Sequence, residues 1–435
     1  MNVERRSCRI SAFTMAKDDV FQHQKSRGMR DLLPSDMQRF RRVEQAFREG
    51  CVAYGYEEVK PPTIEYLSLF TALGTLTPGM VGRVYSFLDW DGWSGERVVL
   101  RPDSTIPVAR LYVENLSPRA PIRLSYVTNS FVFEETGEKN RERWQCGAEF
   151  IGGASVVTEV EILQLAQDVI SRLGFDGVRL QVCHAGLLKA LIEELDLPSA
   201  EREQLVETVL DGDWRGLFER VAAVGSDKRY LLPLVDIRGN SAGYLENIRA
   251  LAFDSGESFR QAIDQFIEVA TLLDELEVKY EIDITAVRTF EYYTGICFQF
   301  LSPSGEKIGG GGRYDDLIPL MGGPDISACG FALYIDQLMG MMQEQAGTGR
   351  FVAVVCDESS PQVVRRTLEV AGAIRTVGGA AAVGICRGPE FTEMYRWVVR
   401  ILPEDLDRVE VLDTETNERT VCTIADAVGR LMSQS

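Results

Sequence analysis

The sequence is poor in histidine and in paired cysteines. Its 435 residues include only two histidines, His23 and His184, and nine cysteines that stand singly, without a CxxC pair or a Cys/His cluster. Zinc sites and disulfide frameworks are built from such pairs and clusters, so we expect neither a metal site nor a disulfide, and mostly structural, reduced thiols. No Ser/His/Asp or Cys/His arrangement indicates covalent catalysis, and the sequence predicts no cofactor.

Long apolar runs and excess positive charge are missing too. No stretch approaches the roughly 18 to 20 apolar residues of a membrane helix, and the first thirty residues hold no apolar signal-peptide core, so we expect a cytoplasmic protein without a membrane partner. Acidic residues number 65 against 46 basic ones, for a net charge of −19. Because this balance repels phosphate backbones, non-specific nucleic-acid binding is not expected.

With 435 residues, of which 45% are hydrophobic, the chain is expected to form at least two folded domains. Residues 1–25 are polar and irregular, and we expect them to be a flexible leader. Residues 26–346 mix helical and strand patterns, including a helix-rich insertion at 186–275. Residues 347–349, Gly-Thr-Gly, are interpreted as a linker, and residues 350–435 alternate strand and helix as in a small α/β domain. Antiparallel strands are expected at 96–102, 122–133 and 144–153.

Two segments carry polar residues at strand ends or on one strand face. The first, LRPDSTIPVAR at 100–110, brings Arg101, Asp103 and Thr105 close together, although a surface turn explains it equally well. In the second, Gln145 and Glu149 lie four apart on a strand that returns from a charged loop, hence on one face. A solvated hairpin is the ordinary interpretation, but an acid among apolar neighbours is costly unless it meets a cation or a partner.

Two further segments supply aromatic rings and glycines. AVRTFEYYTGICFQF places Arg288, Tyr292 and Tyr293 before a strand, which offers a guanidinium fork for a carboxylate and phenols for a polar ring. Adjacent tyrosines are more often packing residues. KIGGGGRYDDLIPLMGG has four successive glycines at 309–312, which favour either close approach of a ligand or strand, or a sharp bend.

In this order the four segments, together with GMRDLLP at 28–34 and the YGYEEVKPPTIE that follows, resemble the histidyl-tRNA synthetase family of class II synthetases over about residues 27–435. The resemblance implies an α+β fold: an antiparallel sheet of six or seven strands with surrounding helices and a helical insertion, plus a C-terminal α/β domain like an anticodon-binding domain. GMRDLLP and the YGYEEVKPPTIE that follows resemble the first motif of the family, which forms dimers, so the resemblance implies self-association at least to a dimer.

The resemblance also implies a pocket for L-histidine. The ammonium group would lie among four side chains, those of Asp103, Thr105, Gln145 and Tyr292. Glu149 and Tyr293 would meet the imidazole, and Arg288 the carboxylate. Asp103 stands where the family has a glutamate, so its reach is shorter.

The sequence departs from a synthetase where ATP should bind. Val132 replaces the arginine that grips the α-phosphate and Gln337 the arginine that meets the γ-phosphate, which leaves Arg141 as a residual phosphate contact. Losing one such preorganised cation costs about 10²- to 10³-fold in rate, so two losses argue against adenylation, and no catalytic residue is predicted. The C-terminal domain holds 10 arginines, no lysine and 13 acidic residues, 10 − 13 = −3. It lacks the basic stripe of an anticodon reader, so tRNA is not an expected partner.

A synthetase-like pocket without the ATP cations resembles the regulatory subunits of ATP phosphoribosyltransferase in histidine biosynthesis. That resemblance implies a hetero-octamer with a short-form catalytic subunit, in which the regulatory subunit is needed for activity and for feedback by histidine through coupling between sites. Two alternatives stay open. One is a divergent histidine-tRNA ligase that holds ATP with Arg141, Arg288 and Mg²⁺; the other is a paralogue that activates another acid or acts as a stand-alone sensor.

Overall fold

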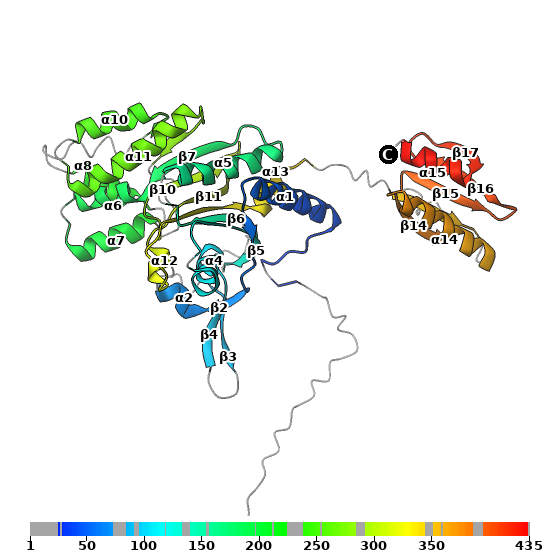
Figure 1. Ribbon diagram of the computed structural model, residues 1–435, viewed down its shortest axis with the longest axis horizontal. Coiled ribbons are helices and arrows are strands. Elements are labelled where there is room, and N and C mark those ends of the chain that lie inside the picture. The colour runs from blue at the N-terminus through cyan, green and yellow to red at the C-terminus, as the bar shows by residue number, and fades with distance from the viewer. Residues whose placement is uncertain are drawn as a thin grey trace, which may run out of the picture. The chain divides into compact units, whose positions relative to one another are not determined.

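The computed structural model divides the chain into two compact units, Met1–Met342 and Gln343–Ser435 (Figure 1). Most of the leader (1–24) and the linker at 347–349 lie outside the residues that the structure describes. Among the described residues, no helix is long and apolar enough to cross a membrane. The described residues are 25–26, 28–72, 84–90, 95–117, 119–132, 140–153, 156–195, 197–210, 213–223, 238–252, 255–283, 292–343, 351–357, 360–385 and 395–433.

A nine-stranded sheet forms the centre of the first unit as described, in the order β1-β5-β6-β12-β11-β10-β7-β9-β8. Its strands are β1 (Glu57–Glu58), β5 (Ile122–Phe131), β6 (Glu142–Ile151), β7 (Arg179–His184), β8 (Arg238–Gly239), β9 (Glu281–Asp283), β10 (Ile296–Leu301), β11 (Lys307–Arg313) and β12 (Ala328–Tyr334). The six strands from β5 to β7 pair antiparallel, whereas β1 and β9 join in parallel. The expected sheet of six or seven antiparallel strands is therefore extended at its edges by very short strands.

A second, three-stranded sheet in the order β2-β4-β3 joins the first unit, and its β3–β4 hairpin extends away from the main sheet (Figure 1). These strands are β2 (Ile64–Tyr66), β3 (Ser86–Trp90) and β4 (Gly95–Leu100). The helices of the unit are α1 (Pro34–Ala53), α2 (Leu67–Ala72), α4 (Thr105–Leu111), the π-helix η1 (Tyr112–Leu116), α5 (Val156–Arg172), α6 (Ala185–Glu193), α7 (Ser199–Leu210), α8 (Arg215–Ala222), α10 (Ala242–Leu251), α11 (Glu257–Glu275), α12 (Leu317–Leu320) and α13 (Ile335–Met341).

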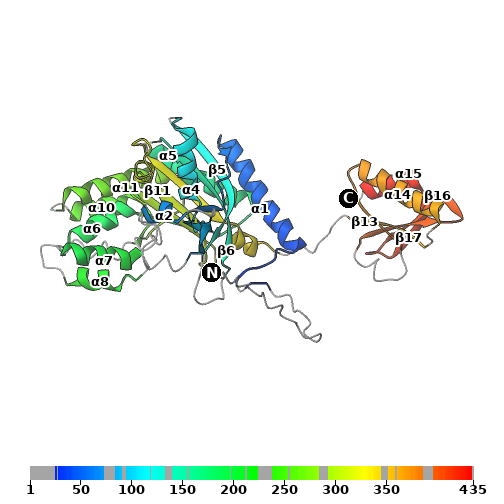
Figure 2. The same cartoon turned by 90° about the horizontal axis from the view of Figure 1, so that it is seen from below.

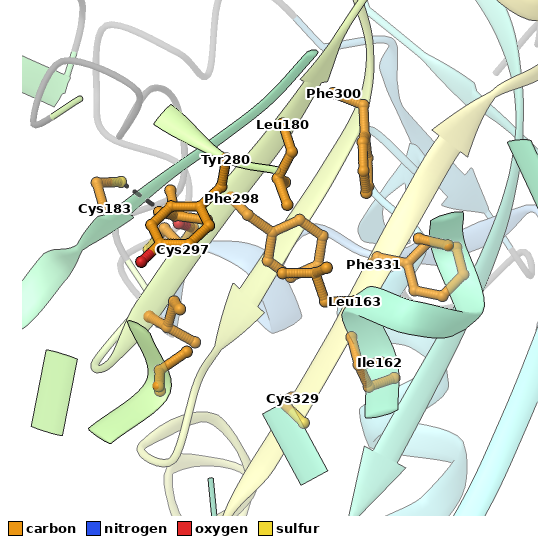
Figure 3. Close-up of a cluster of buried hydrophobic side chains, with 14 of the residues drawn as sticks. Ile162, Leu163, Leu180, Cys183, Tyr280, Cys297, Phe298, Phe300, Cys329 and Phe331 are labelled. Carbon is orange, nitrogen blue, oxygen red and sulfur yellow. Dashed lines mark hydrogen bonds between the residues drawn. The ribbon is translucent and has the colours of Figure 1, made fainter. Parts of the chain in front are cut away.

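Helices α1 and α5 cover one face of the main sheet. In α1, Phe40, Val43 and Phe47 recur at helical spacing and are buried. The helix begins at Pro34, because proline suits the first turn and the Asp36 carboxylate accepts a hydrogen bond from the Leu33 N–H at 3.0 Å. Figure 3 shows side chains of α5 meeting those of the strands, including Phe331 of β12, whose ring lies 6.4 Å from that of Phe47.

The helical pattern at 186–275 forms an insertion between β7 and β9. Its helices gather at one end of the main sheet (Figures 1 and 2). Of these, α11 packs on α5 and β7 and buries an apolar stripe that includes Phe259, Ile263 and Phe266. The insertion thus packs against the β7 side of the main sheet and contributes to the sheet only the two residues of β8.

The second unit is a five-stranded sheet in the order β14-β13-β15-β16-β17 with two helices. Its elements are β13 (Phe351–Cys356), α14 (Pro361–Thr376), β14 (Ala380–Ile385), β15 (Trp397–Leu402), β16 (Asp405–Asp413), β17 (Glu418–Thr423) and α15 (Ile424–Ser433). The first three strands of that order are parallel and the last two antiparallel. Residues 408–423 form a hairpin that turns at Asn417, whose φ of 58° suits asparagine.

Candidate functional site

The side chain of Glu149, on β6, is the centre of a buried polar cluster in the first unit. Glu149 is 1% exposed. Its Oε1 accepts hydrogen bonds from Thr105 Oγ1 at 2.8 Å and Tyr126 OH at 3.1 Å, and its Oε2 accepts one from Tyr314 OH at 2.5 Å. Three hydroxyl donors from α4, β5 and the turn after β11 therefore converge on one carboxylate.

Glycines on the two strands next to β6 make room for this cluster. In the pairing register Glu149 lies beside Gly330 of β12, which lies beside Gly312 of β11. A Cβ on Gly330 would stand 1.6 Å from Glu149 Oε2, and one on Gly312 would stand 3.0 Å from the Tyr293 ring. Residues 309–312 are paired on both sides within a strand, so they form no bend; their glycines permit the close approach that the sequence left as one of two alternatives.

Four tyrosines belong to this cluster. Tyr126 and Tyr314 donate to the Glu149 carboxylate, and Tyr292 and Tyr293 extend the cluster through ring contacts. The Tyr292 ring lies 5.1 Å from that of Tyr293 and 5.7 Å from that of Tyr314, both edge to face. Tyr292 is 8% exposed. The sequence singled out Tyr292 and Tyr293 but missed Tyr126 and Tyr314. One signal for Tyr314 was available, since it follows the glycines at 309–312 by two residues.

Burial decides the electrostatics of the pocket. It raises the pKa of Glu149 to about 8, against the opposing hydrogen bonds from Tyr314, Thr105 and Tyr126, and the nearby Asp103 charge adds to the rise. Burial also raises the pKa of Asp103 to about 6, against hydrogen bonds from backbone N–H groups. Two carboxyl groups that are costly to ionise without a counter-charge favour a ligand that carries positive charge.

Asp103 and Gln145 lie at the edges of this cluster. Asp103 Oδ1 accepts a hydrogen bond from the Ile106 backbone N–H at 2.9 Å, so this carboxylate caps the first turn of α4 and helps to place Thr105. Gln145 is 7% exposed and lies on the same face of β6 as Glu149, paired with Thr128 and Tyr334. Arg288, the expected partner of a ligand carboxylate, lies outside the described residues.

Arg101 has a structural role. Its guanidinium is 2% exposed and donates to the carbonyls of Pro61 at 2.9 Å, Pro62 at 2.7 Å and Asn129 at 2.7 Å. These contacts tie the chain before β2 to β5. Arg101 therefore anchors the loop that carries Asp103 and Thr105 and offers no cation to a ligand.

The region expected to hold nucleotide phosphates differs from the Glu149 cluster because two of its positions carry uncharged side chains. Val132 and Gln337, each half-buried, bring no charge. Arg141 Nη1 donates to Tyr85 OH at 3.2 Å, and the Arg141 N–H donates to the Gly28 carbonyl at 2.8 Å. Its aliphatic stem packs on Gly28, where a Cβ would stand 2.7 Å from Arg141 Cγ.

Next to Gln337, Asp336 is already engaged. One of its carboxylate oxygens pairs with the Arg30 guanidinium, and the other accepts a hydrogen bond from the Trp144 N–H at 3.0 Å. Burial raises the pKa of Asp336, and Arg30 opposes this rise. In the part of the chain that the structure describes, no group of three His, Cys, Asp or Glu side chains is arranged to hold a metal ion.

Comparisons with known proteins identify the family of the chain. The family model for histidyl-tRNA synthetase matches residues 28–338. An ATP phosphoribosyltransferase regulatory subunit from Dehalococcoides mccartyi is 44% identical over 394 residues, which are 90% of this chain and 95% of that protein. A histidine–tRNA ligase from Methanocaldococcus jannaschii is 30% identical over 364 residues, 82% of this chain and 85% of the ligase.

A solved structure gives the same result. It is that of an ATP phosphoribosyltransferase regulatory subunit/histidyl-tRNA synthetase from Bacillus halodurans C, and it matches with a TM-score of 0.75 at 25% identity, over 87% of this chain and 98% of that one. The expected α+β, class II synthetase-like fold is confirmed. The chain belongs to the histidyl-tRNA synthetase family and, within it, to the regulatory subunits of ATP phosphoribosyltransferase.

Proposed function

We propose that this protein is a non-catalytic regulatory subunit of an ATP phosphoribosyltransferase, needed for activity and for histidine feedback in the first step of histidine biosynthesis. One observation carries the proposal: a carboxylate-centred pocket is intact around Glu149, while Val132 and Gln337 leave the phosphate region without two of its cations. The 44% identity to a regulatory subunit over 95% of that protein supports the same assignment.

The ligand of the pocket is L-histidine in this proposal. Its ammonium group lies near Asp103, Thr105, Gln145 and Tyr292, its imidazole near Glu149 and Tyr293, and its carboxylate near Arg288. The partially desolvated acids at Asp103 and Glu149 favour a cationic ligand, because a positive charge lowers the cost of ionising both. Arg141, which donates to Tyr85, is the remaining candidate contact for a phosphate.

The partner is a short-form catalytic subunit, assembled with this chain into a hetero-octamer in the cytoplasm. Mixing the two purified proteins in equal amounts is expected to raise the turnover of the catalytic subunit and to yield a larger species in gel filtration. Adding L-histidine to the mixture is expected to lower the turnover. No change in rate and no change in elution would refute the assignment.

The ligase alternative predicts a different reaction. A histidine–tRNA ligase must exchange pyrophosphate into ATP when histidine is present, and a relative with that name is 30% identical to this chain. We expect no histidine-dependent exchange, because the adenylation transition state needs cations that Val132 and Gln337 do not supply. Exchange at a rate typical of the ligases would favour the alternative. Calorimetry with L-histidine and, separately, with ATP completes the test: histidine is expected to bind.

A further inference from the structure

A partly buried ion network lies directly beside the tyrosines of the pocket, and the proposed function assigns it no role. Arg313, the last residue of β11, has a side chain that is 19% exposed and donates from all three guanidinium nitrogens. Its Nε reaches Asp315 Oδ2 at 2.7 Å, Nη1 reaches Glu159 Oε1 at 3.2 Å, and Nη2 reaches Ser327 Oγ at 2.9 Å. One arginine thus joins the end of β11 to α5 and to the start of β12.

Arg313 and its neighbour Asp315 also contact Thr294 and Gly295, the two residues before β10. The Thr294 N–H donates to the Arg313 carbonyl at 2.8 Å, and the Asp315 N–H donates to Thr294 Oγ1 at 3.1 Å. The arginine stem lies over Gly295, where a Cβ would stand 2.8 Å from Arg313 Cδ. The segment that follows Tyr292 and Tyr293 is therefore fixed by backbone and side-chain contacts with Arg313 and its neighbour.

Tyr314 is held between two members of the network. It stands between Arg313 and Asp315 in the chain, and its N–H donates to the Ala328 carbonyl at 2.8 Å. Asp315 Oδ1 in turn accepts from the Ala328 N–H at 3.2 Å. These bonds set the direction from which the Tyr314 hydroxyl reaches Glu149.

We propose that Arg313 is a positioning residue of the pocket, which holds Tyr292, Tyr293 and Tyr314 around Glu149 through Thr294 and Asp315. Its guanidinium touches no ligand in this account. A fork with three separate partners fixes a geometry that a single ammonium cannot reproduce. The proposal rests on the proposed function for its ligand, L-histidine. The claim that Arg313 holds the tyrosine segments in place concerns the unliganded protein.

The test compares Arg313→Gln with a matched control, Arg123→Gln. Arg123 also pairs with an acid of α5, since its Nε and Nη2 donate to Glu161 at 2.7 and 2.9 Å, and this pair lies outside the Arg313 network. Two quantities are measured on the full-length chain: the Kd for L-histidine by calorimetry, and hydrogen–deuterium exchange of the peptides that contain Thr294 and Asp315 without ligand. Arg313→Lys is carried in parallel and judged by the same criteria if the glutamine variant does not fold.

We expect Arg313→Gln to weaken histidine binding roughly 10- to 100-fold and to speed exchange in the two peptides about tenfold or more, with Arg123→Gln within about twofold of wild type in both. Exchange that stays unchanged in the Arg313 variant, or that rises equally in both variants, would overturn the proposal. If wild-type protein binds no histidine, the proposed ligand fails, but the exchange measurement still decides whether Arg313 positions the tyrosines.

Discussion

The amino-acid side and the nucleotide side of the synthetase-like site differ in their hydrogen bonding and in their charge. On the amino-acid side, the Glu149 carboxylate accepts hydrogen bonds from three hydroxyl donors and lies against Gly330, where a Cβ would clash with it. On the nucleotide side, Val132 and Gln337 are uncharged, and Arg141 donates to Tyr85 and the segment at Gly28. Buried polar groups are normally hydrogen-bonded, and the Glu149 cluster meets this condition, whereas Val132 and Gln337 supply no cation on the nucleotide side.

This contrast separates recognition from chemistry. Binding an amino acid requires complementary charges and shape, whereas adenylation also requires cations placed where negative charge develops. A protein that keeps the first and lacks the second can report the concentration of its ligand without consuming it. The contrast can be broken or sharpened by changing one side at a time.

Glu149→Gln should have the largest effect. A neutral amide cannot accept from three hydroxyls and carries no charge for a cation, so we expect histidine affinity to fall about 100-fold or more. Calorimetry measures the change. The matched control is Glu161→Gln, an acid of α5 that pairs with Arg123, which should stay within about twofold of wild type. Similar affinities for the two variants would show that the pocket is not centred on Glu149.

Gly330→Ala also changes the amino-acid side, by adding a methyl group without changing any charge. Its methyl group would stand 1.6 Å from Glu149 Oε2, so the carboxylate must move, and we expect a loss of about 1–3 kcal/mol in the free energy of unfolding together with weaker histidine binding. Gly340→Ala in α13 is the control, because no atom lies within 4 Å of the position that its new methyl group would take. Urea denaturation followed by tryptophan fluorescence compares them. Equal stability of the two variants would contradict the tight seat of Glu149.

The pH dependence of stability tests the burial of the acid. Folding raises the pKa of Glu149 from 4.5 to about 8, so the folded protein binds a proton that the unfolded chain has released in this window. Stability from this group is complete below about pH 4.5 and is lost as the pH rises towards 8, by an amount on the order of 5 kcal/mol. Urea midpoints of unliganded protein should fall between about pH 5 and 8, and Glu149→Gln should flatten the decline. A flat wild-type profile would show that Glu149 is solvated.

Restoring the cations should give the smallest effect. In Val132→Arg with Gln337→Arg, we expect pyrophosphate exchange to rise from undetectable to barely measurable, since Arg141 and Asp336 remain engaged with their present partners. Histidine affinity should change less than about twofold. The uncharged double variant Val132→Leu with Gln337→Leu controls for volume. A loss of histidine binding in the arginine variant alone would mean that the two sides are not independent.

The sequence could predict the fold class and several pocket residues because those depend on local periodicity and ordered motifs. Strand alternation places Gln145 and Glu149 on one face without any tertiary information. Strands of two or three residues, such as β1 and β9, are too short to show a period, so the width of the sheet was underestimated.

Contacts between segments that are distant in the sequence could not be predicted from periodicity and motifs. Tyr126 and Tyr314 reach Glu149 only through the register of the folded sheet. Arg101 stood in a promising motif, but its partners are the carbonyls of Pro61, Pro62 and Asn129, which no spacing rule reveals. Asp103 was expected at the ligand, and its additional task as a helix cap emerges only from the Ile106 contact.

The glycine strand β11 has one more consequence. Residues 309–312 carry no side chains, so the layer between the aromatic pocket and the apolar core is only one backbone thick. A Cβ on Gly312 would meet the Tyr293 ring, while one on Gly311 would meet Phe331. The tyrosine cluster and Phe331, whose ring packs near Phe47 of α1, are therefore separated at this strand by backbone alone, so a side chain added at Gly311 or Gly312 would disturb the packing next to it.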